Sequence, residues 1–225
     1  SDEEVIYREQ ESKLYYVDYK LVNSHSVITV ATTRPETILG DTAICVHPHD
    51  ERYLGLIGKT VLVPLINREI PIISDKYIEQ DFGTGALKVT PAHDINDYLI
   101  GEKNNLEIIS VIDKNGCMHP NAQLYIGEDR FLVREKIIHD IQNINQLNKI
   151  EVIKNKVGFS ERTNAVIEPR ISSQWFMKMK NLAEPALENV INKNIKFYPE
   201  KFQNTYKHWM VNIRDWCLSR QLWWG

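Results

Sequence analysis

The sequence DFGTGALKVTPAHDINDY, residues 81–98, decides the fold at the centre of this chain. Gly83 and Gly85 flank a threonine, and glycine permits a positive φ or the close approach of a ligand to the backbone. The apolar run that follows, interrupted by one lysine, predicts a short strand over residues 86–90. Pro91 ends that strand, and polar residues follow it directly. The stretch therefore predicts a glycine turn, a strand and a polar rim.

Several side chains capable of chemistry gather at the end of this strand. Alternation along the strand directs Lys88 and Thr90 to the same face. Asp94 and Asp97 are three residues apart, so one turn of helix after the proline places both carboxylates on one side. On spacing alone, these features fit a ligand pocket, and they fit a structural corner between a strand and a helix equally well.

A metal site on this rim is the weaker interpretation. His93 and Asp97 are one helical turn apart and could share an ion, but no matching group of His and Cys occurs elsewhere in the sequence. Cys45, Cys117 and Cys217 are far apart and form no Cys-x-x-Cys motif. The sequence therefore predicts neither a zinc knuckle nor a disulfide framework.

A second candidate stretch is ATTRPET, residues 31–37, where a strand meets a loop. Thr32 and Thr33 present two hydroxyls there, and Arg34 is biased towards an extended backbone because proline follows it. Thr33 also suits the N-cap of a helix that has Pro35 at its second position and Glu36 at its third. The two interpretations are compatible, because a helix amino terminus with exposed hydroxyls suits a polar or anionic ligand.

Short β-branched runs separated by turn residues predict strands through much of the chain. We expect them over residues 14–22, 26–32, 41–47, 59–66, 69–73, 107–113, 150–153 and 159–167, with a hairpin between the first two. Apolar spacing predicts helices over residues 50–56, 130–147, 182–191 and 209–217. Many short strands at such spacing favour a barrel or a sandwich.

The composition is that of a globular protein with room for a sizeable core, since 43% of its 225 residues are apolar and 25% are charged. No apolar run approaches the roughly 20 residues of a membrane helix, and no signal peptide is visible, so we expect no membrane association and a cytoplasmic location. The start lacks a methionine, which suggests an excised fragment. Residues 149–225 hold 13 Lys and Arg against 7 Asp and Glu, which fits either nucleic-acid contact or a solvated surface.

The run GTGALKVTPAHDINDY, residues 83–98, resembles the editing-site motif of the class I aminoacyl-tRNA synthetases for branched aliphatic amino acids, and most closely its valyl branch. Three details favour that branch: KVT at 88–90 before Pro-Ala-His, asparagine before Asp97, and the ending SRQLWWG. The isoleucyl and leucyl relatives usually have arginine where Leu222 stands. The similarity extends over the whole chain.

The resemblance implies a mixed α/β (α+β) fold. Residues 1–168 would form a β-barrel-like editing domain with peripheral helices, and the expected helix over residues 130–147 would cover the barrel. Residues 169–225 would form a helical connecting segment that returns to the Rossmann catalytic core of the synthetase. The sequence lacks the class I nucleotide-binding motifs His-x-Gly-His and Lys-Met-Ser-Lys-Ser. We therefore expect no cofactor for this chain, although a parent synthetase would use ATP and Mg.

The implied activity is hydrolysis of the aminoacyl ester of mischarged threonyl-tRNA(Val), a post-transfer editing reaction. An apolar pocket selects valine over threonine by only about a hundredfold, the established figure for this pair, so a second pocket must demand the hydroxyl. By resemblance, the catalytic residues are Asp97, Thr32, Thr33 and Lys88, and the substrate-binding residues are Arg34, Phe82, Thr90, Asp94 and Asp97. Asp97 would hold the α-ammonium, and the threonines would contact the terminal adenosine or position the attacking water.

The implied partners are the 3′ acceptor end of tRNA(Val) and the remaining domains of a parent synthetase. Water would attack directly, because the neighbouring ribose hydroxyl already activates the ester and no Gly-x-Ser-x-Gly nucleophile motif occurs. Two alternatives stay open. One is a pure binding module that presents tRNA to another domain. The other is a metal-dependent hydrolase that uses His93, Asp94 and Asp97.

Overall fold

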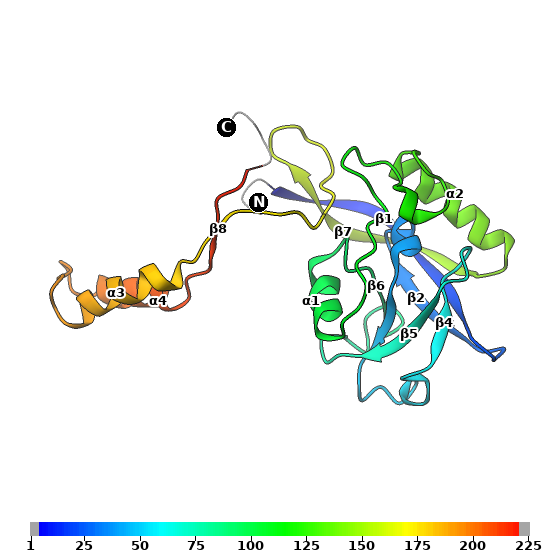
Figure 1. Ribbon diagram of the computed structural model, residues 1–225, viewed down its shortest axis with the longest axis horizontal. Coiled ribbons are helices and arrows are strands. Elements are labelled where there is room, and N and C mark those ends of the chain that lie inside the picture. Colours follow the sequence, from blue (N-terminus) through cyan, green and yellow to red (C-terminus); the bar gives the residue numbers. More distant parts are fainter. Residues whose placement is uncertain (1–4, 221–225) are drawn as a thin grey trace. The chain divides into compact units, whose positions relative to one another are not determined.

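The computed structural model describes residues 5–220, whose ribbon is shown in Figure 1. The chain divides into two compact units, one over Ile6–Ile171 and the other holding Val5 and the described residues from Ser172 onward. The assignment of an editing role to residues 1–168 and a connecting role to 169–225 stays a prediction. Leu222 and the first four residues, which contributed to the expectations above, lie outside the described residues.

The first unit has the mixed α/β structure that the sequence predicted. Its strands are β1 Val5–Leu21, β2 Val27–Thr32, β3 Ala43–Val46, β4 Thr60–Leu62, β5 Glu69–Ser74, β6 Ala86–Val89 and β7 Leu147–Ser160. Its α-helices are α1 Ile95–Lys103 and α2 Arg130–Asn143, and its 3₁₀ helices are η2 Pro35–Gly40, η3 Leu54–Leu56 and η4 Pro120–Ala122. Around Pro91 the chain passes from strand β6 through a short polar segment into helix α1, as expected.

The strands form a mainly antiparallel sheet with the order β2-β1-β4-β5-β3-β6, and β7 pairs with β1 beside this path. The pair β3 and β5 is parallel. Among the described strands, β2 and β6 end the path; they are in contact, but no hydrogen-bonded ladder joins them, so the predicted barrel is not confirmed. β6 is only four residues long, because Gly85 precedes it and Pro91 follows soon after, which leaves little backbone for a closing ladder.

The predicted hairpin is confirmed by β1 and β2, which pair from Tyr15 with Thr32 to Lys20 with Val27. Asn23 supplies the left-handed turn residue, with φ of +58°. β7 differs from the prediction, because one strand runs from Leu147 to Ser160 where two shorter ones were expected. The strand continues along its partner β1, and of residues 161–167, where the second strand was expected to continue, only Val166 makes an isolated bridge, with Phe159.

The core lies between the sheet and α2. Asp129 is the N-cap of α2, and its side chain accepts hydrogen bonds from the backbone N–H groups of Phe131 and Leu132. The helix buries Val133, Ile137, Ile138 and Ile141 and packs against η2. Strands contribute the remaining large buried side chains, among them Tyr19, Ile28, Ile44 and Ile72. Figure 1 shows α2 lying across one side of this unit, so the predicted helix is present, but the barrel that it was expected to cover is not confirmed.

Two predicted elements of this unit are wrong. Residues 107–113 form no strand; of them only Ile112 makes an isolated bridge, with Met118. Val111 and Ile112 are fully buried, so their apolar character reflects packing of a loop. Residues 50–56 contain only the short η3 in place of an α-helix, because the Asp50 side chain binds the amide and guanidinium of Arg52 in a local turn.

The second unit contains α3 Lys180–Ile191 and α4 Phe202–Val211, which contact each other, and a small ladder of β8 Phe176–Met177 with β9 Trp216–Cys217. The predicted helix over 182–191 is confirmed by α3. The predicted helix over 209–217 is partly wrong: Trp209 lies in α4, but Trp216 and Cys217 pair with β8. Helical spacing of the aromatic residues could not reveal that strand partner.

Candidate functional site

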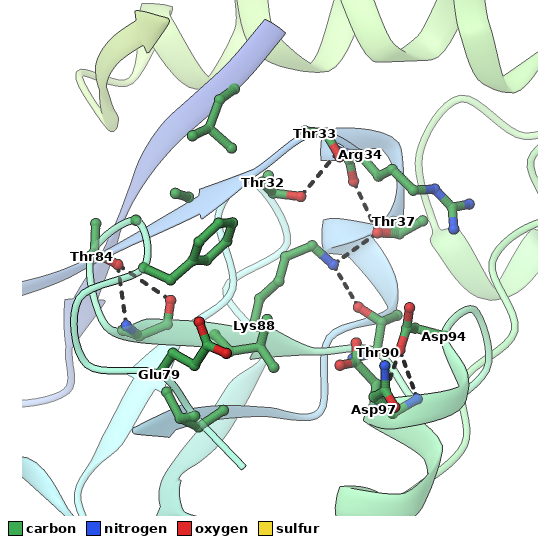
Figure 2. Close-up of a pocket in the computed structure, with 18 of the residues that line it drawn as sticks. Thr32, Thr33, Arg34, Thr37, Glu79, Thr84, Lys88, Thr90, Asp94 and Asp97 are labelled. Carbon is green, nitrogen blue, oxygen red and sulfur yellow. Dashed lines mark hydrogen bonds between the residues drawn. The ribbon is translucent and has the colours of Figure 1, made fainter. Parts of the chain in front are cut away.

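A cavity of about 560 Å³ opens in the first unit, between the end of β2, the glycine loop before β6 and the start of α1 (Figure 2). Leu14, Ile153 and Asn155 contribute to its wall from β1 and β7. The eight site residues named from the sequence all line this cavity: Thr32, Thr33, Arg34, Phe82, Lys88, Thr90, Asp94 and Asp97. The fold thus brings together the site residues of two separate stretches of the chain, residues 31–37 and 81–98.

Thr32 and Thr33 occupy the point where β2 leads into η2. The Thr32 hydroxyl oxygen accepts a hydrogen bond of 3.0 Å from the backbone N–H of Arg34. The N-cap of η2 is Arg34, with no side-chain cap bond, so the interpretation of Thr33 as a cap is wrong. Within residues 5–220 the half-buried Thr33 hydroxyl has no hydrogen-bond partner, which leaves it available to a ligand in the cavity.

Lys88 lies on β6 and is buried beside the cavity. Its ammonium donates to the hydroxyl of Thr37 at 2.8 Å, to the hydroxyl of Thr90 at 2.6 Å and to Oδ1 of Asp41 at 3.1 Å. A lysine ammonium has three hydrogens, so these bonds use its whole capacity. Lys88 and Thr90 share a face, as predicted. The Lys88 ammonium, however, has no hydrogen left to donate to a substrate hydroxyl.

Asp97 lies in the first turn of α1 and is only 7% exposed. Its Oδ2 accepts a hydrogen bond of 2.8 Å from the backbone N–H of Thr90, and among the described residues its Oδ1 has no partner. Burial raises the pKa of Asp97 to about 7; the charge of Lys88 and the Thr90 bond oppose this, while Asp94 and Asp41 add to it. Such a carboxylate is poised to gain from a cationic ligand.

Asp94 is the N-cap of α1. Its Oδ1 accepts from the backbone N–H groups of Asn96 at 2.8 Å and Asp97 at 3.1 Å. The bonds hold the helix start at the cavity, where the aligned backbone dipoles favour negative charge. Within the described part of the chain, Oδ2 of Asp94 has no hydrogen-bond partner, so one acceptor remains for a ligand.

Arg34 lines the cavity, but its charge is balanced within the protein. Its guanidinium pairs with Glu168 at 2.5 and 2.6 Å, with the fully buried Glu36 at 3.4 Å, and with the backbone oxygen of His93 at 3.1 Å. Glu168 also binds Arg130 and His93. Burial alone would raise the pKa of Glu168, but the His93 hydrogen bond and the two arginines outweigh it and lower that pKa to about 2.

His93 is not placed as a metal ligand. Its Nε2 lies 3.0 Å from the backbone N–H of Val111, which donates to it, and its Nδ1 lies 3.2 Å from Oε1 of Glu168. Both ring nitrogens are therefore engaged by partners within the protein, and neither is left for a metal. No group of three metal-ligating side chains occurs in the described residues. The hypothesis of a metal-dependent hydrolase gains no support from this geometry.

Phe82 projects from the glycine loop and is 72% exposed. The two ends of this loop are tied to the body of the unit. Arg52 donates to the backbone oxygen of Gln80 at 2.6 Å, and Tyr53 donates to that of Thr84 at 2.7 Å. Gly85 has φ of +75°, which confirms the turn predicted from the sequence. An exposed ring on an anchored loop at the cavity wall suits stacking against a planar ligand.

The charges around the cavity do not cancel. Lys88 is paired with Asp41, and Arg34 is paired with Glu168 and Glu36. The carboxylates of Asp94 and Asp97 have no basic partner among the residues that the structure describes. The α1 end of the cavity is therefore acidic and lined with hydroxyls, an environment that fits a small cation bearing polar groups.

Sequence reasoning missed Thr37, Asp41 and Glu168, which hold the side chains of Lys88 and Arg34. Asp41 precedes the wholly apolar strand β3, and a carboxylate beside such a strand was the one local sign of a buried acid. Glu168 is 134 residues from Arg34 in the sequence, so no local pattern could reveal that pair.

The helices of the described structure are all short or polar: none in residues 5–220 is long and apolar enough to cross a bilayer.

The family model of tRNA synthetases class I (I, L, M and V) matches residues 1–225, and the chain belongs to this family. Within it, the chain is 60% identical to the valine–tRNA ligase of Parabacteroides distasonis, 57% identical to that of Bacteroides fragilis and 53% identical to that of Carboxydothermus hydrogenoformans. Each match covers 100% of this chain and 26% of the relative, so the chain spans about a quarter of their length. The predicted resemblance to the valyl branch is confirmed.

A solved structure also resembles this chain. It is a leucyl-tRNA synthetase of Agrobacterium radiobacter, in a ternary complex with tRNA and LeuAMS. The TM-score is 0.50 at 21% sequence identity, over 65% of this chain and 20% of that one. At this identity the likeness concerns the fold alone.

Proposed function

We propose that this chain hydrolyses the aminoacyl ester of mischarged threonyl-tRNA(Val), as the editing domain of a valyl-tRNA synthetase. The observation that carries the proposal is Asp97, nearly buried at the acidic end of the cavity with Oδ1 free of protein partners. A carboxylate in this setting fits the α-ammonium of an aminoacyl ester, since a charge-assisted hydrogen bond is strongest where water is excluded. Membership of the synthetase family supports an aminoacyl ester as the ligand.

The preference for threonine over valine follows from the polar lining. Asp94 keeps Oδ2 as an acceptor near Asp97, so it can receive the hydroxyl of a threonyl group. A valyl group offers a methyl there and leaves this acceptor unpaired. Asp94 is exposed in the free protein, so the cost of about 1–3 kcal/mol for an unpaired polar group applies once the bound ester shields it from water. Thr90 and Lys88 act by shaping this end of the cavity, because their hydrogen bonds run to each other and to Asp41.

Hydrolysis needs no protein nucleophile, because the neighbouring ribose hydroxyl activates the ester. The free hydroxyl of Thr33 lines the cavity and can position the attacking water, with Thr32 beside it. Catalysis then comes from positioning and electrostatics. Phe82 can stack on the terminal adenine, and Arg34 retains one N–H on Nη1 for the nucleotide after its bonds to protein.

The proposal extends to the setting of the reaction. The ligand is the 3′ acceptor end of tRNA(Val), and residues 169–225 connect the editing domain to a cytoplasmic synthetase. Such a synthetase would use ATP and Mg for ligation, at a site outside the cavity described above. The sheet of the first unit would serve as the scaffold of a barrel-like editing domain.

A deacylation assay tests this function. The chain is mixed with threonyl-tRNA(Val), with valyl-tRNA(Val) as the matched substrate, and released amino acid is measured against the uncatalysed rate. We expect faster release of threonine and little acceleration for valine. Release of threonine at the uncatalysed rate would overturn the proposal, and tRNA binding without turnover would favour the pure binding module.

A further inference from the structure

A buried carboxylate lies directly behind the cavity. Asp41, which follows η2, is completely buried. Its Oδ1 accepts from the ammonium of Lys88 at 3.1 Å and from the hydroxyl of Thr90 at 2.6 Å, and its Oδ2 accepts from the hydroxyl of Tyr19 at 2.5 Å. Both oxygens are thus satisfied within the protein, and Asp41 itself does not line the cavity.

A second carboxylate, that of Asp97, is near enough to Lys88 for the two charges to act on each other. Thr90 stands between the two carboxylates, since its hydroxyl donates to Asp41 while its backbone N–H donates to Asp97. The charge of Lys88 acts on Asp97 as well, because it works against the rise in the pKa of that carboxyl. Yet in the described residues the ion pair of Lys88 is with Asp41, and Figure 2 shows the ammonium bonded to Thr37 and Thr90.

We propose that Asp41 is a positioning residue of the cavity: it holds the ammonium of Lys88 in the interior, so that the carboxylate of Asp97 stays uncompensated and open to a cationic ligand. If Asp41 lost its charge, Asp97 would become the nearest partner for Lys88. An internal ion pair would then occupy the carboxylate that a substrate ammonium needs. Thr37 assists by taking the third hydrogen of the Lys88 ammonium.

The surroundings of Asp97 agree with this division of charge. The titratable groups that act on it come from each neighbouring element: Lys88 of β6, Asp94 at the start of α1, Asp41 after η2, Cys45 of β3 and Tyr77 of the loop after β5. Lys88 is the only base among them in the described structure. The state of Asp97 therefore depends on which carboxylate Lys88 pairs with.

The substitution Asp41→Asn tests the proposal. Asparagine has the same shape, so its side-chain oxygen can still accept from Lys88 and Thr90 while the charge is removed. The readout is the titration midpoint of the Asp97 carboxyl carbon, followed by NMR in the whole 225-residue chain and assigned by the loss of its signal in Asp97→Asn. We expect the midpoint to fall by about 1–3 pH units, the effect of an opposite charge that moves to within roughly 4–6 Å.

Lys88→Met, with and without Asp41→Asn, separates movement of Lys88 from the simple loss of a negative charge. In the Lys88→Met background no ammonium is left to move, so adding Asp41→Asn should lower the midpoint of Asp97 much less than the same change does in the wild type. An equal fall in the two backgrounds would overturn the proposal. So would an unchanged or raised midpoint in Asp41→Asn.

Circular dichroism establishes that each variant is folded. If Asp41→Asn does not fold, Tyr19→Phe replaces it, because this change weakens the hold on Asp41 from the side away from the cavity. We then expect a smaller fall in the same midpoint, and no fall would overturn the proposal. The inference rests on the proposed function, which supplies the cationic ligand of Asp97, but the titration uses no substrate. A failed deacylation assay and an unchanged midpoint are therefore separate results.

Discussion

The backbone N–H of Thr90 donates a hydrogen bond of 2.8 Å to Oδ2 of Asp97. This bond ties the end of β6 to the first turn of α1 across Pro91, and it orients the carboxylate so that Oδ1 is left to the cavity. A backbone amide near the strand end thereby fixes the direction of the side chain on which the proposed function depends.

Asp97→Asn should sharply reduce the hydrolysis of threonyl-tRNA(Val). Asparagine can keep the bond from Thr90, but its amide group replaces the anion that faces the substrate ammonium. Loss of a hydrogen bond to a charged group costs about 1.5–3 kcal/mol, which is about 10- to 150-fold in kcat/KM. Asp129→Asn is the matched control, because Asp129 caps α2 and does not line the cavity. A near-normal rate for Asp97→Asn would mean that the ammonium binds elsewhere.

The pH dependence of the reaction should follow Asp97. Burial raises the pKa of Asp97 to about 7, and only the ionised form binds a cation well, so kcat/KM should increase as the pH rises from about 6 to 8. The sign for stability is opposite. The folded state retains a proton that the unfolded state has released, so the free energy of unfolding should decrease as the pH rises between about 4 and 7.

Asp97→Asn gives the comparison for both pH effects. The variant should lose the rise in kcat/KM, and its free energy of unfolding should decrease less over that pH range than that of the wild type. Thermal unfolding measured at several pH values supplies the stability readout without any substrate. A rate profile that keeps its rise near pH 7 in the variant would assign the titration to another group.

Lys88 should prove important for stability as well as for specificity. Breaking a buried ion pair leaves an uncompensated charge and costs about 3–5 kcal/mol, so Lys88→Ala should lower the free energy of unfolding substantially through Asp41. Among the molecules that remain folded, we expect lower activity on the threonyl ester and a narrower preference over the valyl ester. The measurement is kcat/KM for both esters at a temperature where circular dichroism shows folded protein. An equal loss for both esters would deny Lys88 a role in discrimination.

The sequence located the cavity well but not what supports it. Thr32, Lys88 and Asp97 were identified because they stand in short stretches that resemble motifs of the synthetase family, whereas spacing alone fitted a structural corner equally well. Asp41 and Glu168 were missed because they act on Lys88 and Arg34 across 47 and 134 residues. Hydrogen-bond capacity was equally out of reach: only the folded geometry shows that the ammonium of Lys88 has no donor left.

Glu168 should account for part of the acid sensitivity of the fold. Its folded pKa of about 2 lies below its ordinary value of 4.5, so its stabilisation is present above about pH 4.5 and is lost as the pH falls towards 2. The difference corresponds to roughly 3 kcal/mol. Glu168→Gln should thus destabilise the protein at pH 7 and make its acid denaturation shallower. Glu128→Gln is the control, since its ion pair with Lys136 is exposed and contributes little. If the free energy of unfolding falls equally steeply between about pH 4.5 and 2 in the wild type and in Glu168→Gln, this role of Glu168 is refuted.

Gly85→Ala should disrupt the loop that carries Phe82. Gly85 has φ of +75°, and an added Cβ would strike the guanidinium of Arg52 and approach the backbone oxygen of Gln80 to 2.8 Å. The left-handed backbone alone costs about 1–2 kcal/mol for alanine, and displacement of Arg52 removes an anchor of the loop. We expect a lower free energy of unfolding in urea and a raised KM for threonyl-tRNA(Val). Gly55→Ala is the matched control, because its Cβ meets nothing within 4 Å and should change stability by less than about 0.5 kcal/mol. Equal stability of the two variants would show that the loop tolerates a shift of Arg52.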